Sequence, residues 1–245
     1  MSLITLENVT KSYSLGGNHV DALSGISLKI ERGEFVALSG PSGSGKSTLF
    51  SLVAAMARPT AGRICIDGED ISAFGNSQGA MLRRRMFGFV FQSFNLMPVL
   101  TAFENIELPL LLTSAGSAER KQRVEEVAAR LEIANLLSHR PNEMSGGQKQ
   151  RVAIARALVT RPQIVIADEP TANLDSKTGQ LVLEIAKERC RIDGVTFLFS
   201  SHDATMVSQA DRVVTLRDGK LISAGRAVGA DVAQADAGIV ARVHG

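Results

Sequence analysis

Short apolar runs alternate along the chain with segments of helical periodicity, which is the pattern of an α/β protein. Three runs have the length and composition of buried strands: residues 34–39, 164–167 and 196–200. Helical spacing of apolar residues follows the first run, in Lys46–Met56, and precedes the last, in Ser176–Cys190. In the later helix the apolar positions are Leu181, Val182, Ile185 and Ala186. Because continuous apolar strands separated by helices are typical of a parallel sheet covered on both faces, we predict such a sheet.

Two other regions depart from this pattern. Residues 3–31 and 64–68 alternate and turn like antiparallel strands, and 212–222 has the Asp-Gly turn of a β-hairpin. Residues from about 93 to 160 are mostly helical in pattern, with i, i+3, i+4, i+7 spacing in Val124, Val127, Ala128 and Leu131. We therefore predict an α/β core with an antiparallel β subdomain, formed by residues 1–92 and 161–225, and a helical subdomain inserted at about 93–160. Residues 226–245 are predicted to be a short C-terminal tail.

The composition is that of an ordinary globular protein. Of the 245 residues, 44% are hydrophobic and 21% are charged, which excludes a disordered chain. The formal net charge of +2 is too balanced to indicate nucleic-acid binding through overall charge. Two cysteines, Cys65 and Cys190, are too few for a disulfide framework or a four-ligand zinc site.

No apolar stretch approaches the roughly 20 residues that a membrane span needs. The N-terminal residues lack a basic region followed by a long apolar one. We therefore expect a reduced, cytoplasmic, soluble protein without a signal peptide.

A phosphate-binding motif lies between a predicted strand and a predicted helix. Its residues fit the pattern G-x-x-x-x-G-K-[ST]: Gly40, Pro41, Ser42, Gly43, Ser44, Gly45, Lys46 and Ser47. The glycines let backbone N–H groups turn toward an anion, and the helix N-terminus adds about half a positive charge. A nucleoside triphosphate carries about four negative charges, more than Lys46 and the helix end neutralise, so we predict Mg²⁺ with Ser47 as a ligand.

A carboxylate that holds this Mg²⁺ is expected at the end of a neighbouring strand. The apolar run 164–167 is followed by Asp168 and Glu169. Because adjacent side chains of a strand point in different directions, we predict that Asp168 ligates Mg²⁺. Glu169 then faces an attacking water, as general base or at least to orient it.

A second helix start has the features of an anion site. Met144, Ser145, Gly146, Gly147 and Gln148 precede the predicted helix Lys149–Leu158. Ser145 is a suitable N-cap, and the two glycines permit close approach of a ligand to the backbone. One nucleotide at residues 40–47 does not obviously need both sites.

Taken together, these motifs occur in the order found in the ATP-binding subunits of ATP-binding cassette (ABC) transporters, and the chain resembles that family over about residues 3–225. The resemblance implies a P-loop NTPase fold with a RecA-like core, and hydrolysis of ATP with Mg²⁺ coupled to transport. The signature segment of the family normally begins with leucine. Met144 stands there in this chain, which is a volume-conserving change.

Individual residues acquire roles through the same resemblance. Tyr13 is similar to the aromatic that stacks on adenine, Gln92 to the glutamine that contacts Mg²⁺ and water, and His202 to the histidine that contacts the γ-phosphate. The segment 173–175 resembles the loop that crosses the dimer interface. The implied catalytic residues are Lys46, Gln92, Glu169 and His202, and the implied metal ligands are Ser47, Gln92 and Asp168. The implied ATP-binding residues are Tyr13, Ser39, Gly40, Pro41, Ser42, Gly43, Ser44, Gly45, Lys46, Ser47, Thr48, Ser145, Gly146, Gly147, Gln148 and Asp175.

The resemblance also implies a homodimer. In the family, the segment equivalent to 145–147 of one subunit binds the ATP held by the P-loop of the other, which accounts for the second anion site. Such a dimer drives an integral membrane permease from the cytoplasmic side of the cell membrane, and no nucleic acid is expected as a partner.

The run from Phe91 to Leu110 resembles the branch that contains the lipoprotein-release ATPase and the ATPase part of macrolide exporters. In that branch, ATP binding moves a large extracytoplasmic domain of the permease, a process called mechanotransmission. A cell-division ATPase with a similar permease remains an alternative. Only 20 residues follow Gly225, so we expect no C-terminal regulatory domain of the type found in sugar importers.

Non-transport members of the superfamily fit less well. Chromosome and DNA-repair ATPases carry a coiled coil or zinc modules between the P-loop and the signature, and the 100 positions from Gly45 to Ser145 show neither. Translation-factor relatives need two cassettes, and this chain has one. Arg83–Arg85 could contact phosphates, but a solvated or structural role is favoured.

Overall fold

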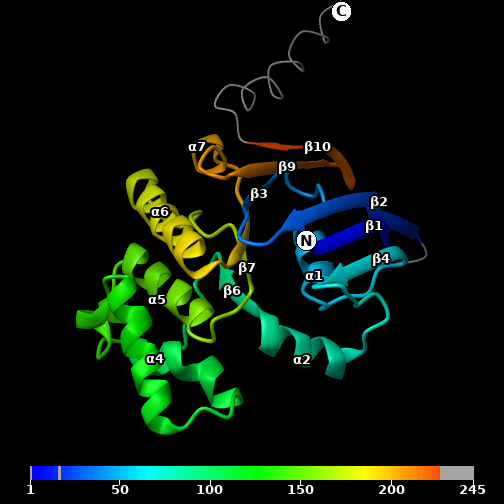
Figure 1. Ribbon diagram of the computed structural model, residues 1–245. Coiled ribbons are helices and arrows are strands. Elements are labelled where there is room, and N and C mark those ends of the chain that lie inside the picture. The colour runs from blue at the N-terminus through cyan, green and yellow to red at the C-terminus, as the bar shows by residue number, and fades with distance from the viewer. Residues whose placement is uncertain (1, 16–17, 227–245) are drawn as a thin grey trace, which may run out of the picture.

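Two sheets and the helices around them make up the computed structural model, which describes residues 2–15 and 18–226 (Figure 1). The tail predicted for 226–245 lies outside the described residues except for Arg226. The larger sheet has the strand order β10-β9-β3-β8-β7-β6. Its parallel strands are β3 (Phe35–Ser39), β6 (Phe87–Phe91), β7 (Ile164–Asp168), β8 (Thr196–Ser200) and β9 (Arg212–Arg217). Strand β10 (Lys220–Arg226) pairs antiparallel with β9 and forms the predicted hairpin.

The smaller sheet is antiparallel, as the alternating N-terminal pattern predicts. Its strand order is β2-β1-β4-β5. The bounds are β1 (Ser2–Leu15), β2 (Asn18–Glu31), β4 (Ala61–Ile66) and β5 (Glu69–Asp70).

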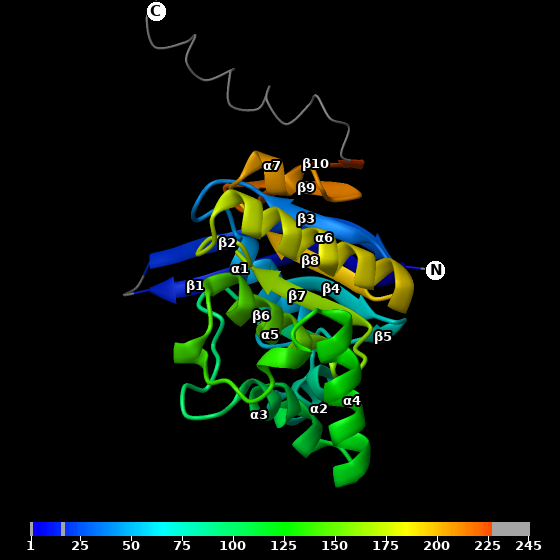
Figure 2. The ribbon, with the colours of Figure 1, turned by 90° about the vertical axis from the view of Figure 1, so that its left-hand side faces the viewer.

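Helices fill the connections between the strands. The α-helices are α1 (Lys46–Val53), α2 (Asn76–Met86), α3 (Ala102–Glu107), α4 (Ser117–Arg130), α5 (Gly146–Leu158), α6 (Ser176–Asp193) and α7 (Ala204–Val207). Three 3₁₀ turns lie in the middle of the chain: η1 (Leu108–Leu112), η2 (Ala134–Leu136) and η3 (Pro141–Glu143). Figure 2 shows α3 and α4 together, below the larger sheet.

Each inner strand of the larger sheet faces two hydrophobic cores. On β3, Phe35 and Ala37 join one core, whereas Val36 and Leu38 join the other. Strands β7 and β8 alternate in the same way, as side chains of a strand must. The second core is completed by α1 and the smaller sheet, and the first by α3 to α7. The predicted parallel sheet with both faces covered is therefore confirmed, and the mixed α/β fold class with it.

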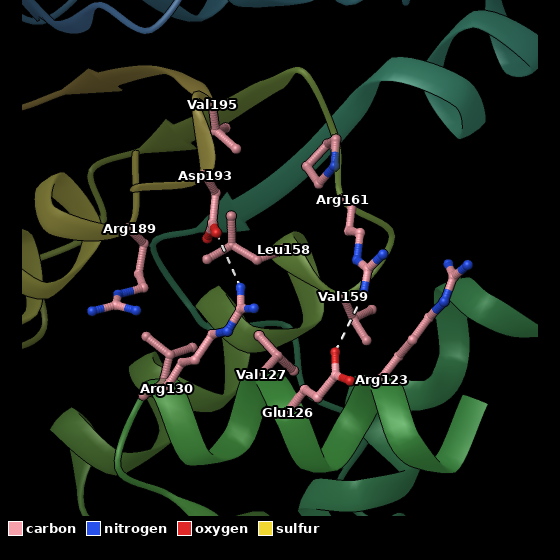
Figure 3. Close-up of a pocket in the computed structure, with 12 residues that line it drawn as sticks. Arg123, Glu126, Val127, Arg130, Leu158, Val159, Arg161, Arg189, Asp193 and Val195 are labelled. Atoms are coloured by element: carbon pink, nitrogen blue, oxygen red, sulfur yellow. Dashed lines mark hydrogen bonds and ion pairs between the residues drawn. The ribbon is translucent and has the colours of Figure 1, made fainter. Parts of the chain in front are cut away.

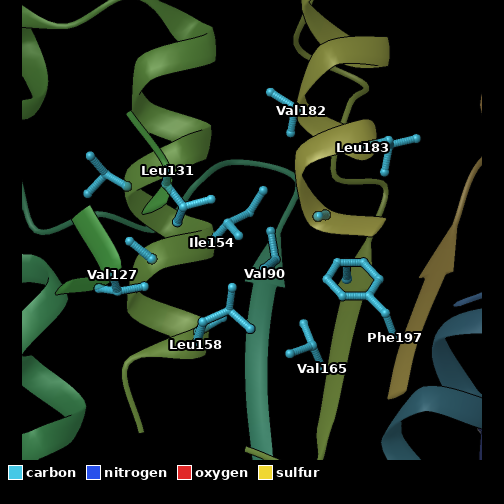
Figure 4. Packing of buried hydrophobic residues seen from close by; sticks show 14 of the residues in the cluster. Val90, Val127, Leu131, Ile154, Leu158, Val165, Val182, Leu183 and Phe197 are labelled. Carbon is cyan, nitrogen blue, oxygen red and sulfur yellow. The ribbon is translucent and has the colours of Figure 1, made fainter. Parts of the chain in front are cut away.

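The first core joins the helical region to the sheet. Figure 4 shows Val90, Val165 and Phe197, from three neighbouring strands, against Ile154 of α5 and Val182 of α6. Of the four helical positions predicted to be apolar, Val124, Val127, Ala128 and Leu131, all are buried in this core. The helical region is thus packed on the sheet through apolar side chains and not only attached by its two connections.

Three sequence predictions need correction. Helix α1 ends at Val53 instead of Met56, because the chain turns with a left-handed backbone at Ala55 (φ 49°). Leu181 of α6 is 50% exposed, and the buried stripe of that helix runs through Val182 and Leu183 instead. Leu181 lies one helical step of about 100° before Val182, which carries it off that stripe. Helix α2 was not predicted at all.

None of the described helices has the length and apolar character required to cross a membrane.

Candidate nucleotide site

The P-loop connects β3 to α1, and two of its glycines, Gly40 and Gly45, cannot be replaced without a clash. Gly40 and Gly45 have φ values of 144° and 104°, which favour glycine. A Cβ on Gly40 would lie 2.1 Å from the carbonyl oxygen of Leu216 in β9. A Cβ on Gly45 would lie 2.7 Å from the carbonyl oxygen of Ala22 in β2. The loop therefore passes between the two sheets at backbone distance and turns directly into the N-terminus of α1.

A buried hydroxyl in this loop has no partner. Ser44 is only 2% exposed, and its Oγ atom forms no hydrogen bond with any other described residue. An unpaired buried polar atom is costly, so its retention at a helix N-terminus fits a site that takes a hydrogen-bonding anion.

Lys46 lies folded over its own loop. Its Nζ atom donates to the carbonyl oxygens of Gly40 (2.7 Å) and Pro41 (3.1 Å), and the residue is buried. Burial lowers the pKa of Lys46, while the nearby carboxylates of Glu169 and Asp168 act in the opposite direction. The ammonium group therefore already lies beside the P-loop. A phosphate bound there would be a stronger hydrogen-bond partner than the two neutral carbonyls, because it is charged.

Asp168 ends β7 and is oriented from both sides by hydroxyl groups. Its Oδ2 accepts a hydrogen bond from Ser47 Oγ (3.1 Å), and its Oδ1 accepts one from Ser200 Oγ (2.7 Å). Ser47 and Asp168, two of the three residues predicted to ligate Mg²⁺, are therefore brought together.

Glu169 turns away from Asp168 because the strand has ended. Its backbone is left-handed (φ 48°), an unfavourable conformation for a residue with a side chain. Strain of this kind is concentrated at functional sites. The two carboxylates have different partners: Asp168 accepts from Ser47 and Ser200, whereas Glu169 lies beside His202.

Ser200 is a site residue that the sequence analysis missed. It is fully buried at the end of β8, where its Oγ accepts from the backbone N–H of Glu169 (2.8 Å) and donates to Asp168. One hydroxyl thereby positions both acids. The available signal was a serine ending an apolar strand, which is too common to be diagnostic.

The carboxylate of Glu169 meets His202. Nε2 of His202 and Oε1 of Glu169 are 2.9 Å apart, and the glutamate side chain is 16% exposed. Burial raises the pKa of Glu169, and the repulsion from Asp168 adds to this, while His202 and Lys46 counteract it. A buried carboxylate with a raised pKa next to a phosphate-binding loop is suited to accept a proton from water.

One cavity of about 280 Å³ gathers these groups. It is lined by P-loop residues 42–48 together with Gln92, Asp168, Glu169 and His202. Gln92 follows β6, and its backbone oxygen accepts from Asn173 Nδ2 (2.8 Å). Residues that end or follow four strands, β3 (through the P-loop), β6, β7 and β8, thus converge, as expected at the carboxyl edge of a parallel sheet.

Magnesium fits this donor set better than a transition metal does. The described residues contain no cluster of three or more His, Cys, Asp or Glu side chains that could hold a metal by themselves. Mg²⁺ usually takes one or two protein oxygens and completes its shell with phosphates and water. Asp168 and Ser47 provide such oxygens.

The second predicted anion site lies elsewhere. Ser145 caps α5 in a capping box with Gln148, accepting from Gln148 N (3.3 Å) and donating its own N–H to Gln148 Oε1 (2.8 Å). None of residues 145–148 lines the cavity around the P-loop. A Cβ on Gly147 would lie 2.4 Å from Cγ2 of Thr178, so this glycine also serves the packing of α5 against α6.

Asp175 and Tyr13 are not in the cavity either. Asp175 caps α6 by accepting from Thr178 N (3.1 Å), and its hydrogen bonds to Thr178 lower its pKa. Tyr13 is 40% exposed on β1, with Lys11 Nζ 4.9 Å from the centre of its ring. Their roles toward ATP stay predictions.

A larger hollow of about 400 Å³ between α4, α5 and α6 has a structural explanation (Figure 3). The C-termini of these three helices, at Arg130, Leu158 and Asp193, meet around it. Helix C-termini carry negative partial charge. Four arginines line the hollow, and Arg130 pairs with Asp193 across it (3.0 Å). The arginines neutralise helix ends and acids, so we do not assign a ligand to this hollow.

Comparison with known proteins agrees with this geometry. The family model described as "ABC transporter" matches residues 23–172. An uncharacterized ABC transporter ATP-binding protein of Thermotoga maritima is 45% identical over 219 residues, which are 89% of this chain and 93% of that protein. The macrolide export ATP-binding/permease protein MacB of Brucella melitensis is 45% identical over 90% of this chain, but over only 34% of MacB.

Among solved structures, a similar one is the dimeric post-hydrolysis state of the cassette MJ0796 of Methanocaldococcus jannaschii, bound to ADP and Pi. It has a TM-score of 0.83 and 40% identity, and the match covers 92% of this chain and 99% of that one.

Proposed function

This chain belongs to the ABC transporter family and is one of its ATP-binding, ATP-hydrolysing cassettes, and from that premise we propose how its residues carry out the reaction. The observation that carries the proposal is the single cavity that gathers the P-loop with Gln92, Asp168, Glu169 and His202. The proposed active site includes all residues predicted from the sequence to be catalytic or to ligate the metal.

Phosphate binding begins with an exchange of partners. The N–H groups of the P-loop and the N-terminus of α1 attract the triphosphate. Lys46 then releases the carbonyl oxygens of Gly40 and Pro41 and donates to phosphate oxygens. Because the loop is fixed between two sheets, little reorganisation accompanies binding.

Ser47, Asp168 and Gln92 would hold Mg²⁺ beside the phosphates. When bound, the ion supplies positive charge that stabilises the oxygens of the transferred phosphoryl group. The chain's own contribution is orientation, since Ser200 fixes Asp168 by a 2.7 Å hydrogen bond.

Hydrolysis requires a base close to the γ-phosphate, and Glu169 is placed for that role. Its carboxylate accepts a proton from the attacking water, helped by the raised pKa that burial gives it. Nε2 of His202 lies 2.9 Å from this carboxylate, and His202, being 54% exposed, has room to turn toward the phosphate.

Two copies of the cassette are proposed to close over ATP. Residues 145–147 form a capped helix start outside the P-loop cavity, so within one chain they have no phosphate to bind. In a head-to-tail homodimer they would add about half a positive charge to the γ-phosphate held by the partner. This accounts for two anion sites and one nucleotide per chain, and it agrees with the dimeric MJ0796 structures.

An integral membrane permease is the proposed partner, bound on the cytoplasmic face of the cell membrane. A groove of about 370 Å³ runs between α2, β6 and η1, and it has an apolar lining that includes Phe89, Phe91 and Leu112. Phe91 and Leu112 are exposed, and Phe91 precedes Gln92. An apolar groove beside an active-site loop suits a segment of the permease whose movement follows the ATP cycle.

We propose lipoprotein release, macrolide or peptide export, or mechanotransmission as the task of the complex. The similarity to MacB, whose name includes both ATP-binding and permease parts, supports this branch. The alternative within the branch is a cell-division ATPase that regulates an extracytoplasmic enzyme through its permease.

The first test is replacement of the P-loop lysine. Lys46→Ala is expected to lower Mg²⁺-dependent ATP hydrolysis at least about 100-fold, because the phosphates lose their main point charge. Release of phosphate from ATP measures this, with Lys29→Ala, an exposed lysine on β2, as the matched control. Unchanged turnover in Lys46→Ala would refute the phosphate site.

A further inference from the structure

The loop that follows Gln92 is held by side chains from other parts of the chain. At its start, Asn173 donates to the carbonyl oxygen of Gln92 (2.8 Å). At its end, the fully buried Asn105 of α3 accepts from the N–H of Met97 (2.7 Å) and donates to the carbonyl oxygens of Met97 (3.1 Å) and Leu100 (3.1 Å). Loops are usually mobile, so this many side-chain contacts indicates that the position of this loop matters.

Between these two anchors lies a strained turn. Phe94 and Asn95 are consecutive and both have left-handed backbones, with φ values of 61° and 47°. Residues with side chains rarely adopt this conformation, and two in succession persist only when surrounding contacts impose it.

Arg156 provides the contacts. Its Nη1 donates to the carbonyl oxygen of Asn95 (2.5 Å) and its Nη2 to that of Phe94 (2.8 Å). A planar guanidinium is suited to hold two oxygens at once, whereas a lysine ammonium is not. Arg156 also lines the apolar groove next to β6, together with Asn95.

Arg156 lies on the same helix as the second anion site. Arg156 belongs to α5, the helix that Ser145 caps. At 1.5 Å per residue, the 13 residues of α5 form a rod about 20 Å long. One end carries the second anion site. Near the other end, Arg156 donates its two hydrogen bonds to the turn that begins two residues after Gln92.

We propose that Arg156 is a positioning residue that ties Gln92 to the helix of the second anion site. Movement of α5, when its start engages the ATP of the partner subunit, then shifts the turn at 94–95 and with it Gln92 and the wall of the groove. The expected shift of Gln92 rests on the proposed function. The two hydrogen bonds from Arg156 to the turn do not, because they lie within one chain.

These two hydrogen bonds are tested without nucleotide by a fluorescent reporter. The chain has no tryptophan, so Phe94→Trp introduces a single one into the turn. Adding Arg156→Lys is expected to raise the acrylamide quenching constant of this tryptophan at least about twofold, since one ammonium cannot hold both carbonyls. Arg151→Lys is the matched control, because Arg151 lies on the same helix and pairs with Glu132 (3.6 Å) instead. Equal quenching in all three proteins would overturn the proposal.

The effect on Gln92 is tested by the Mg²⁺ dependence of ATP hydrolysis. Arg156→Lys is expected to raise the Mg²⁺ concentration for half-maximal activity about fivefold and to lower kcat, while the Kd for Mg²⁺-free ATP changes less than about twofold. Asn95→Gly, which accepts a left-handed backbone without strain, should recover part of this loss in the double variant. A merely structural role for Arg156 predicts equal losses in all three quantities and no recovery, and that result would refute the link.

Transmission along α5 has its own test, which holds even if Arg156→Lys does not fold. In the Phe94→Trp, Glu169→Gln protein, ATP with Mg²⁺ is expected to change the tryptophan emission. Adding Ser145→Arg should abolish that change, although each chain still binds ATP. Persistence of the signal would show that nucleotide reaches the turn without the helix and would overturn the proposal. If the wild-type cassette hydrolyses no ATP, the proposed function fails. The quenching comparison still decides whether Arg156 holds the turn at 94–95.

Discussion

The sequence predicts that an acid, Glu169, lies beside the P-loop, but it does not predict the contacts that hold Glu169 in position. Its acidity after a buried strand follows from the sequence, and so does its position beside the P-loop. The left-handed turn at φ 48° and the supporting hydroxyl of Ser200 do not, because both depend on contacts between strands that are distant in sequence. The function of such a residue is more visible in the sequence than its geometry.

Replacing Glu169 by Gln should separate ATP binding from hydrolysis. The amide cannot accept the proton of water, so turnover should fall at least about 100-fold while ATP binding remains. Analytical ultracentrifugation with ATP and Mg²⁺ is expected to show a dimer, and with ADP a monomer. A monomeric and fully active variant would contradict the roles of both the base and the second anion site.

The same substitution should change stability in a pH-dependent way. The pKa of Glu169 is raised above its usual 4.5, so the folded chain holds this proton more tightly than the unfolded chain. Its contribution to stability is therefore present below pH 4.5 and is lost as the pH rises through the folded-state pKa. Glu169→Gln should have a higher Tm than the wild type at pH 7 to 8, and this advantage should disappear toward pH 4.

Calorimetry across that pH range measures the difference. Glu125→Gln, whose side chain is 55% exposed on α4, is the matched control and should leave Tm unchanged throughout. A Tm difference for Glu169→Gln that does not vary with pH would contradict the assigned effect of burial.

Among the elements, helix α5 combines two demands at its start. Gly147 suits close approach of a phosphate, and it is also required by Thr178, whose Cγ2 would lie 2.4 Å from a Cβ there. Thr178 is 31 positions further along the chain, so this packing constraint on Gly147 is not visible in a local motif.

The strands and the larger helices were predictable because their apolar periodicity is strong. The strand order was not, because it depends on pairing between distant segments.

Helix α2 was missed for a comparable reason. It is polar, carries three consecutive arginines, and includes Gly79, which disfavours a helix. The glycine is needed because a Cβ would lie 2.6 Å from the carbonyl oxygen of Ala55, to which Arg83 also donates (2.7 Å). Arg83 thus has the structural role that the sequence analysis favoured for this cluster.

Ser145→Arg should block dimerisation at the level of this element. A bulky cation at the start of α5 fills the space proposed for the partner's γ-phosphate, whereas the P-loop of the same chain is untouched. We expect normal ATP binding by each chain and no ATP-dependent dimer in a Glu169→Gln background, measured by ultracentrifugation. Ser145→Ala is the comparison variant, since it removes the hydroxyl and its cap, at a cost of about 1 kcal/mol, without filling the space proposed for the phosphate. A normal dimer in Ser145→Arg would exclude this helix start from the interface.

On the scale of the whole molecule, the proposed permease groove and the active site adjoin each other through β6. Leu112→Glu places a charge in the apolar groove and should abolish copurification with the permease. The ATP hydrolysis of the isolated cassette should change less than about twofold, because Leu112 does not line the nucleotide cavity. Ile222→Glu, an exposed position on β10, is the control. Equal loss of copurification in both variants would remove the groove from the interface.

The apolar cluster that spans the larger sheet and α3 to α7 has a consequence for how the chain is built. Residues 93–160 are contiguous in sequence, yet their apolar side chains are buried against strands that come before and after them. Excised by itself, this segment would expose that surface to water and collapse or aggregate. We therefore expect residues 93–160 and the sheet to unfold together as one cooperative unit, whatever relative motion they undergo in the folded chain.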